Sequence, residues 1–433
     1  MEEYLRSNTD YTISPEGALI LIGDLHGSLD RLQDLLPRLQ SEVTKKLGEA
    51  SWAHATLAFM GDYVDKGAQS RALVDRLVAL RGTLLPGQQS VFLMGNHDFS
   101  LMAFLGLIPH DRLDQPHPQC GELGNAFDTK YYESRGETLW HSDGDGECDP
   151  NSELNASNSQ TNQKTNENDK CFDKVYVNEC LCVNGSEHHD ESQSNSSVLS
   201  RKDNENQECA SKKTIPESKK IAEIEKEKTP KGDVEMHIQG RRYGVPESYF
   251  TVVPTFESYG CPCVSRAAFL SNMPPDHKDF FRSLPMISIL EVPGRGYVVC
   301  VHAGLAERYP AREQMELMRA GNCGVSWIEQ ISGTDSVRTP PRDLQRPDVL
   351  VASGHHAILS VADYPSRVII DTSEAEYLSA LVVPPKSIID GMTKREIEKI
   401  MDIDFSDDQV FSEDDLRYGS FLVQSAKIPI AKK

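Results

Sequence analysis

The residues of this chain best suited to chemistry are aspartates, histidines and one asparagine that follow apolar stretches of sequence. They are Asp24, His26, Asp62, Asn96, His302 and His355. Carboxylates, an amide oxygen and imidazoles suit divalent ions such as Mn, Fe or Zn, and the set lacks the thiolates typical of a structural zinc site. We predict that these side chains bind two such ions and share Asp62. Two metals about 3.5–4 Å apart can activate a water for in-line displacement at phosphorus.

Two further residues are candidates for acid catalysis. His97 directly follows Asn96, and the leaving group of a phosphate ester departs as an oxyanion that needs a proton donor. Asp65 lies three residues beyond Asp62, where it can hydrogen-bond the imidazole and keep it protonated. We therefore assign His97 as the general acid and Asp65 as its orienting partner. The alternative for His97 is a histidine that only caps or packs a helix.

Three segments share one plan, an apolar run that ends in a small, polar, glycine-bearing turn. They are ALILIGDLHG from Ala18, ATLAFMGDYVDKG from Ala55 and SVFLMGNHD from Ser90. Each predicts a buried strand that leads into a loop. Leucines at helical spacing over 29–39, and leucines and a valine over 73–80, predict helices between the strands, and hence βαβ units of an α/β fold. Such sheets bind ligands at the carboxyl ends of their strands, which predicts one shared site.

The second half of the chain contains further predicted strands. Residues 287–292 and 297–301 are typical of a hairpin across Pro293–Gly296. The segment DVLVASGHH predicts a strand that ends at His355 and His356, and RVIIDT and LSALVVPP predict closing strands.

Between these two parts, residues 136–234 are dominated by Asn, Ser, Glu, Lys and Asp. Such a composition cannot bury enough apolar surface to offset the entropy of ordering, so we predict a long disordered insertion. The predicted organisation is an N-terminal extension over 1–17, a catalytic domain over 18–391 interrupted by this insertion, and an acidic C-terminal tail over 392–433.

Bulk properties exclude some classes of partner. The 433 residues carry a formal net charge of −21, which argues against attraction to nucleic acid or to an anionic membrane. No apolar run of about 18 residues occurs, and the polar N-terminus is unlike a secretory leader. We therefore expect a cytoplasmic or nuclear protein whose ten cysteines are mostly reduced thiols. Nothing in the sequence indicates the oligomeric state.

The motifs GDLHG, GDYVDKG, GNHD, VHAGL and SGHH resemble those of phosphoprotein phosphatases in the calcineurin-like metallophosphoesterase superfamily. The runs GNHDFSLMAFLGLIP, MHIQGRRYG and TFESYG are similar, more closely, to the plant Rhizobiales-like phosphatase 2 group, which prefers phosphotyrosine. The resemblance implies a four-layer α/β/β/α sandwich and the same six metal ligands, with His97 as the acid. It also implies a phosphoprotein substrate, dually phosphorylated kinase activation loops being the leading candidates, attacked directly by a metal-bridging hydroxide.

One position departs from the family pattern, because Lys66 replaces the usual arginine of GDxxDRG. Lysine is a compact point charge, whereas arginine offers a bidentate fork for phosphate. We expect Lys66 to hold the phosphate together with Asn96 and with Arg241 or Arg242, of which we favour Arg242. A solvent-facing role for both arginines remains open. His356 has no counterpart in the family and is interpreted as pocket lining.

Other functions use the same residues. A phosphoserine/threonine phosphatase, a dinucleoside-polyphosphate hydrolase or a broad phosphodiesterase would place a different leaving group on the same metals. A non-catalytic binding module is the alternative from another class, with Lys66 as a sign of decay. The segment TFESYG from Thr255 either shapes the substrate pocket or forms a turn packed by Phe256 and Tyr259.

Overall fold

The computed structural model describes residues 1–108, 138–140, 236–246, 248–321, 328–360, 366–373, 375, 377–401 and 420–426. The chain divides into one compact unit of Met1–Pro150 and Lys228–Lys433 and a second unit of Asn151–Glu227. Every described residue belongs to the first unit. Apart from 138–140, the predicted insertion lies outside the described residues, as does most of the acidic tail.

The first of two sheets has five strands in the order β11-β10-β2-β3-β4. They are β2 (Leu19–Ile22), β3 (Thr56–Phe59), β4 (Gln89–Phe92), β10 (Ser379–Val383) and β11 (Phe421–Gln424). Strands β2, β3 and β4 are parallel, because each is linked to the next through helices, namely α2 (Leu29–Leu47), α3 (Glu49–Ala53) and α4 (Ser70–Thr83). The three predicted strands and both predicted helices are confirmed.

The second sheet has six strands in the order β1-β5-β6-β7-β9-β8. They are β1 (Tyr11–Thr12), β5 (Ile287–Val292), β6 (Gly296–Val301), β7 (Val349–Ser353), β8 (Leu359–Ser360) and β9 (Arg367–Ile370). The predicted hairpin is confirmed as the antiparallel pair β5 and β6, with Ile287 opposite Val301. Strands β6, β7 and β9 run parallel, so β6 and β7 present their carboxyl ends at one edge.

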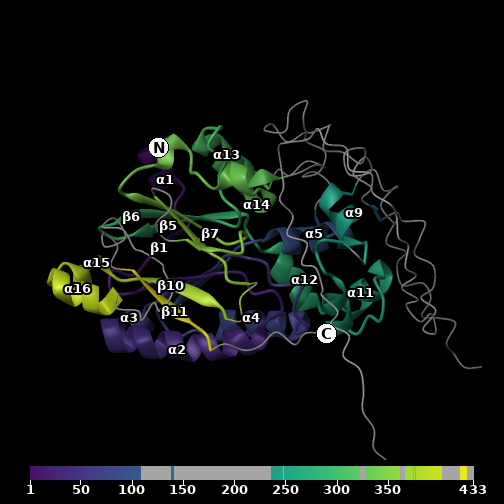
Figure 1. Ribbon diagram of the computed structural model, residues 1–433, viewed down its shortest axis with the longest axis horizontal. Helices are drawn as coiled ribbons and strands as arrows, with labels where there is room; N and C mark the ends of the chain where they lie inside the picture. The colour runs from purple at the N-terminus through teal and green to yellow at the C-terminus, as the bar shows by residue number, and fades with distance from the viewer. Residues whose placement is uncertain are drawn as a thin grey trace, which may run out of the picture. The chain divides into compact units, whose positions relative to one another are not determined.

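The two sheets pack face to face between outer helices (Figure 1). One apolar cluster joins alternate residues of both sheets, among them Leu19 and Leu21 of β2 and Val298 and Cys300 of β6. The intervening residues, such as Ile20 and Ile22, face the helices instead, because successive strand side chains point to opposite faces. Helices α2, α3 and α4 cover the five-stranded sheet, and α1 (Glu2–Ser7), α13 (Ala311–Ala320) and α14 (Glu329–Ser332) cover the other. The predicted four-layer fold is confirmed.

A group of helices lies together on the side of the sheets where the polar motifs end (Figure 1). They are α5 (Asn96–Leu105), α9 (Ile238–Tyr243), α10 (Val253–Ser258), α11 (Arg266–Asn272) and α12 (Pro275–Arg282). A cluster of aromatic side chains fills the space between them, with Phe104, Tyr243, Phe250 and Phe256 all buried. The segment TFESYG falls in and just after α10, and its Phe256 and Tyr259 are packed inside.

Both predicted extensions contribute elements that the sequence pattern did not predict. Strand β1 pairs with β5, and Leu5 and Ile13 are buried near it. In the tail, α16 (Lys394–Met401) is followed by β11, which extends the five-stranded sheet beside β10. Just after β11, the Ala426 amide donates to the Asp34 carboxylate on α2, at 2.6 Å. These short elements depend on pairing with distant strands and therefore give little local signal.

Two cysteines of the described region, Cys261 and Cys300, are buried free thiols, but Cys263 is disulfide-bonded. The prediction that most cysteines are reduced therefore does not hold for Cys263.

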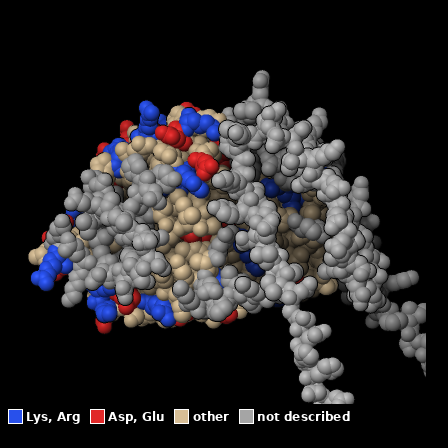
Figure 2. All heavy atoms as spheres, viewed as in Figure 1, with Lys and Arg blue, Asp and Glu red and all other residues tan. Residues whose placement is uncertain are grey.

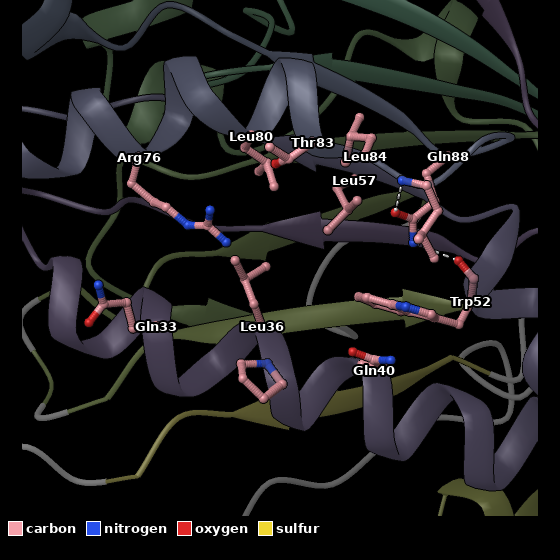
Figure 3. A pocket seen from close by; sticks show the side chains of 12 residues that line it. Gln33, Leu36, Gln40, Trp52, Leu57, Arg76, Leu80, Thr83, Leu84 and Gln88 are labelled. Atoms are coloured by element: carbon pink, nitrogen blue, oxygen red, sulfur yellow. Dashed lines mark hydrogen bonds between the residues drawn. The ribbon is translucent and has the colours of Figure 1, made fainter.

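A groove with a volume of about 540 Å³ lies between α2 and α4 (Figure 3). It is lined by Leu36, Trp52, Leu57, Leu80 and Arg76 among others. None of its lining residues belongs to the predicted site. On the face shown in Figure 2, acidic and basic side chains of the described residues are interspersed. Among the described helices, none is both long and apolar enough to cross a bilayer.

Candidate active site

Most of the predicted site residues lie at the carboxyl ends of the central strands of both sheets, with Asn96 and His97 opening α5 and Arg242 on α9. Several of these residues have left-handed backbones, with φ of 39° at His26, 55° at Asp62 and 71° at His355. Such conformations are rare for residues other than glycine and concentrate at functional sites. Neighbouring glycines leave room for the ligands, since a Cβ atom at Gly95 would clash with the Asp62 carboxylate and one at Gly354 with that of Asp24.

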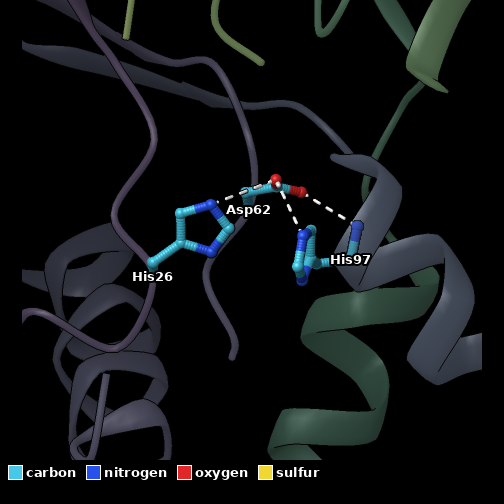
Figure 4. Close-up of side chains that lie close together, drawn as sticks. All are labelled: His26, Asp62 and His97. Atoms are coloured by element: carbon cyan, nitrogen blue, oxygen red, sulfur yellow. Dashed lines mark hydrogen bonds and ion pairs between the residues drawn. The ribbon is translucent and has the colours of Figure 1, made fainter. Parts of the chain in front are cut away.

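One group of potential metal ligands consists of His26, Asp62 and His97, and all three are buried (Figure 4). The Oδ2 atom of Asp62 lies 3.4 Å from His26 Nε2 and 3.9 Å from His97 Nε2. His26 Nδ1 is 2.9 Å from the Val64 carbonyl, which orients the ring toward Asp62. Figure 4 shows Asp62 between the two imidazoles, one from the loop after β2 and one from the start of α5.

A second group consists of Asp62, His302 and His355. His302 Nε2 lies 3.4 Å from Asp62 Oδ2, and its Nδ1 atom lies 2.7 Å from the Met60 carbonyl. The Asn96 Oδ1 atom is 3.0 Å from both His302 Nε2 and His355 Nδ1, so Asn96 belongs to the same cluster. Because Asp62 is common to both groups, the two clusters are contiguous.

Asp24 completes this arrangement. Its carboxylate accepts the backbone N–H of His355, and Oδ2 lies 3.9 Å from His26 Nε2. The structure thus brings all six predicted ligands together. Two come from the loop after β2, one from the loop after β3, one from the start of α5, and two from the segments that follow β6 and β7 of the other sheet.

The electrostatics of the cluster suit cations. Burial raises the pKa of Asp62, but the neighbouring imidazoles, above all that of His302, lower it. The resulting pKa of Asp62 is well below its usual range. Burial lowers the pKa of His302, but Asp62 and Asp24 outweigh this and raise it to about 10. The carboxylates therefore stabilise positive charge at the centre. Donor atoms within 4.8 Å of one another, of the oxygen and imidazole type, fit two borderline divalent ions.

The predicted acid and its partner are in contact. His97 Nδ1 lies 2.8 Å from Asp65 Oδ2. The other carboxylate oxygen, Oδ1, accepts hydrogen bonds from the hydroxyls of Tyr243, at 2.7 Å, and Thr255, at 2.8 Å. Burial raises the pKa of Asp65, although the bond to His97 opposes this. Tyr243 and Thr255 come from GRRYG and TFESYG, so these segments support the His97–Asp65 pair.

The predicted phosphate ligands differ in position. Lys66 is half-buried. Burial lowers its pKa, but Asp62, Asp371 and other nearby acids raise it overall. The Arg242 guanidinium lies over the Phe250 ring, 5.7 Å from its centroid, and Nη1 donates to Gln239. Arg241 is buried instead and its Nε donates to the Trp140 carbonyl. Arg242 is therefore the more accessible arginine, beside a ring that packs on His97.

His356 belongs to neither group of potential metal ligands. Its Nε2 atom lies 2.8 Å from the Ala303 carbonyl, and burial lowers its pKa to about 3. Arg367, which is buried, donates to Ala303 and Ser353 and so joins the loops that carry His302 and His355.

Sequence reasoning missed two carboxylates that shape this site. Asp98 accepts three backbone N–H groups, from Asp62, Tyr63 and Gly95, and thereby ties the second motif to the third. Asp371 follows β9, accepts the Ala357 N–H and acts electrostatically on Asp24 and Lys66. In the sequence, Asp98 ends the motif GNHD and Asp371 ends the predicted strand RVIID, so both positions could have been identified as candidates.

The fold and this cluster of ligands are those of a metallophosphoesterase. The family model for calcineurin-like phosphoesterases matches residues 18–241, just over half of the chain. The chain belongs to the calcineurin-like phosphoesterase family. Enzymes of this family are hydrolases that use divalent metals.

Individual relatives point to more than one activity. A symmetrical bis(5'-nucleosyl)-tetraphosphatase of Janthinobacterium sp. (strain Marseille) is 35% identical over 82 residues, which are 19% of this chain and 24% of that protein. The match thus spans about a quarter of the relative's length.

Among solved structures, a diadenosine tetraphosphatase is 15% identical, with a TM-score of 0.36 over 87% of this chain and 94% of that chain. A cold-active protein-tyrosine phosphatase of a psychrophilic Shewanella species is 9% identical, with a TM-score of 0.32 over 89% of this chain and 80% of that chain. Neither likeness decides between the two activities.

Proposed function

We propose that this chain is a metal-dependent phosphatase that hydrolyses phosphotyrosine in proteins. The observation that carries the proposal is that Asp62 is shared by the groups His26–Asp62–His97 and Asp62–His302–His355, and that His97, the proposed acid, is also paired with Asp65. A phosphomonoester needs charge stabilisation at its oxygens and a proton for its leaving group, and this cluster offers both.

The roles of the residues follow from their chemistry. Two divalent ions held by Asp24, His26, Asp62, Asn96, His302 and His355 would lower the pKa of a water and neutralise phosphate charge. Lys66 and Arg242 would hold the phosphate oxygens, and Asn96 would donate its amide N–H to one of them. As the water oxygen bonds to phosphorus and the ester P–O bond breaks, His97 gives its proton to the departing oxygen. Asp65 holds the ring and stabilises its charge.

Preference for phosphotyrosine rests on the sequence resemblance to the Rhizobiales-like phosphatase 2 group. The segments that carry this resemblance, GRRYG and TFESYG, supply Tyr243 and Thr255 to Asp65. They therefore belong to the acid side of the site, where the leaving group departs. We extend the proposal to activation loops of kinases that carry both phosphothreonine and phosphotyrosine.

A dinucleoside-polyphosphate hydrolase is the second candidate, because the bacterial tetraphosphatase is a relative of this chain over its matched segment. It would use the same metals with a phosphate leaving group. A phosphoserine/threonine phosphatase would need full protonation of a poorer leaving group by His97.

A substrate panel separates these activities. The purified chain, with Mn added, is assayed on a phosphotyrosine peptide, the matching phosphoserine peptide, diadenosine tetraphosphate and bis-p-nitrophenyl phosphate. We expect the highest kcat/KM on the phosphotyrosine peptide and no turnover by Asp62→Asn. Cleavage of only diadenosine tetraphosphate and bis-p-nitrophenyl phosphate would contradict the phosphatase proposal.

The same preparation tests whether the chain is an enzyme at all. Elemental analysis should find Mn, Fe or Zn bound, and it would identify which metals are present. A chain with no bound metal and no activity after metal addition would be a binding module instead.

A further inference from the structure

A solvent-exposed tyrosine stands beside the buried site. Tyr249 is 71% exposed, the highest value among the large hydrophobic side chains classed as exposed in the described part of the chain. Its ring centroid lies 6.5 Å from the His97 ring and 6.0 Å from the Phe250 ring. Single exposed rings are common on protein surfaces, but this one adjoins the proposed proton donor.

The backbone that carries Tyr249 is fixed to the second motif. The Thr251 carbonyl accepts the Lys66 N–H at 3.4 Å, and the Thr251 N–H donates to the Ser248 carbonyl at 3.2 Å. Thr251 has a φ of 52°, which is strained for a β-branched residue. Four residues further on, the Thr255 hydroxyl accepts the Asp65 N–H. The backbone just after Tyr249 is thus held to the loop that carries Asp65 and Lys66.

The inner face of this loop is rigid as well. Phe250 is buried and packs edge-on against His97, with 5.0 Å between ring centroids. The guanidinium of Arg242 lies over the same Phe250 ring, 5.7 Å from its centroid. His97 and Phe250 are therefore buried inside, and Tyr249 lies outside them at the surface. The charge of Lys66 interacts with the Tyr249 hydroxyl.

We propose that Tyr249 determines specificity for aryl phosphates by stacking on the ring of the leaving group. The inference rests on the proposed function, because it requires His97 to protonate the departing oxygen. In a phosphotyrosine the ring is bonded directly to that oxygen, so it must lie next to His97, whose ring centroid is 6.5 Å from that of Tyr249. Aromatic rings pair favourably at centroid separations of about 4.5–7 Å, and a serine or threonine side chain offers no ring.

The test compares Tyr249→Ala with Tyr249→Phe in the full chain. The substrates are a phosphotyrosine peptide and the same peptide with phosphoserine. We expect Tyr249→Ala to lower kcat/KM for the phosphotyrosine peptide about 3- to 10-fold and to leave the phosphoserine value unchanged. Tyr249→Phe should retain the wild-type preference. Tyr11→Ala, which removes another exposed tyrosine far along the chain on β1, is the matched control.

A binding measurement supports the kinetic one. Phenylphosphonate and methylphosphonate differ only in the ring, and neither is hydrolysed at its P–C bond. Tyr249→Ala should weaken inhibition by phenylphosphonate while methylphosphonate inhibits as before. Equal loss for aryl and alkyl compounds, or no loss for either, would overturn the proposal.

Failure of the proposed function would look different. If the wild type cleaves diadenosine tetraphosphate but neither phosphopeptide, the phosphatase proposal fails. The phosphonate pair still tests Tyr249 in that case: selective weakening of phenylphosphonate supports a stacking residue, and equal weakening rejects it.

Discussion

The imidazole of His97 and the carboxylate of Asp65 form a buried pair, with 2.8 Å between Nδ1 and Oδ2. Tyr243 and Thr255 both donate to the second oxygen of Asp65, so the carboxylate is fixed from two helices. A carboxylate held in this way keeps the imidazole ring of His97 oriented through Nδ1.

The pair should matter more for poor leaving groups than for good ones. A phenol ionises near pH ~10 and departs more easily than an aliphatic alkoxide. We expect His97→Asn to lower kcat on alkyl phosphates by about 10²- to 10⁴-fold and on aryl phosphates by less. Asp65→Asn should give the same pattern with a smaller loss. A series of substituted phenyl phosphates measures the dependence on leaving-group pKa, and equal losses across the series would argue against acid catalysis.

Asp62 should control both metals, because it belongs to both ligand groups. We expect Asp62→Asn to abolish turnover and to reduce bound metal from about two ions per chain toward none. Elemental analysis after gel filtration measures the content. Asp279→Asn, which changes an exposed carboxylate on α12, should retain full metal and activity. Retention of both ions by Asp62→Asn would contradict the shared-ligand assignment.

Lys66 should contribute to phosphate binding. Removing a charged hydrogen-bond donor from a buried anion site costs about 1.5–3 kcal/mol, so Lys66→Ala should lower kcat/KM for a phosphopeptide by about 10- to 100-fold. Lys66→Arg should restore part of this. Lys386→Ala, an exposed lysine on α15 (Lys386–Ile389), serves as the control. An unchanged kcat/KM in Lys66→Ala would remove this role.

Asp98 should act through backbone geometry rather than through substrate. Its carboxylate accepts N–H groups of Asp62, Tyr63 and Gly95, so Asp98→Ala leaves three buried donors without it. We expect a lower melting temperature and weaker Mn binding, because each unsatisfied donor costs about 1–3 kcal/mol. Differential scanning fluorimetry with and without Mn checks both. Wild-type Mn affinity in a destabilised Asp98→Ala would show that the loop geometry survives.

The attachment of β11 should weaken in acid. Hydrogen bonds from Arg38 and from the Ala426 N–H lower the pKa of Asp34 below 3.8. Its stabilising contribution is therefore complete above pH 3.8 and is lost as pH falls through the lower folded-state pKa. The difference in denaturation midpoint between the wild type and Asp34→Asn should shrink over that acidic range. A difference that persists at the lowest pH would mean that the charge of Asp34 plays no part.

The sequence by itself determined the three strand-to-loop motifs and the ligand types. Apolar runs such as ALILI and SVFLM must become buried strands, and their polar ends must then meet at one edge of a parallel sheet. The hairpin of β5 and β6 was equally local. In these segments the period of hydrophobic residues is enough to predict a strand, because that period depends only on residues that are neighbours along the chain.

Only the tertiary structure decided how the site is assembled. His302 and His355 meet Asp62 and Asn96 because two sheets pack through a shared apolar core, and no local pattern encodes that packing. The support of Asp65 by Tyr243 and Thr255 joins residues nearly two hundred positions apart. Tyr249 gained its place beside His97 in the same way, since contacts between distant segments arise from packing free energy rather than from spacing along the chain.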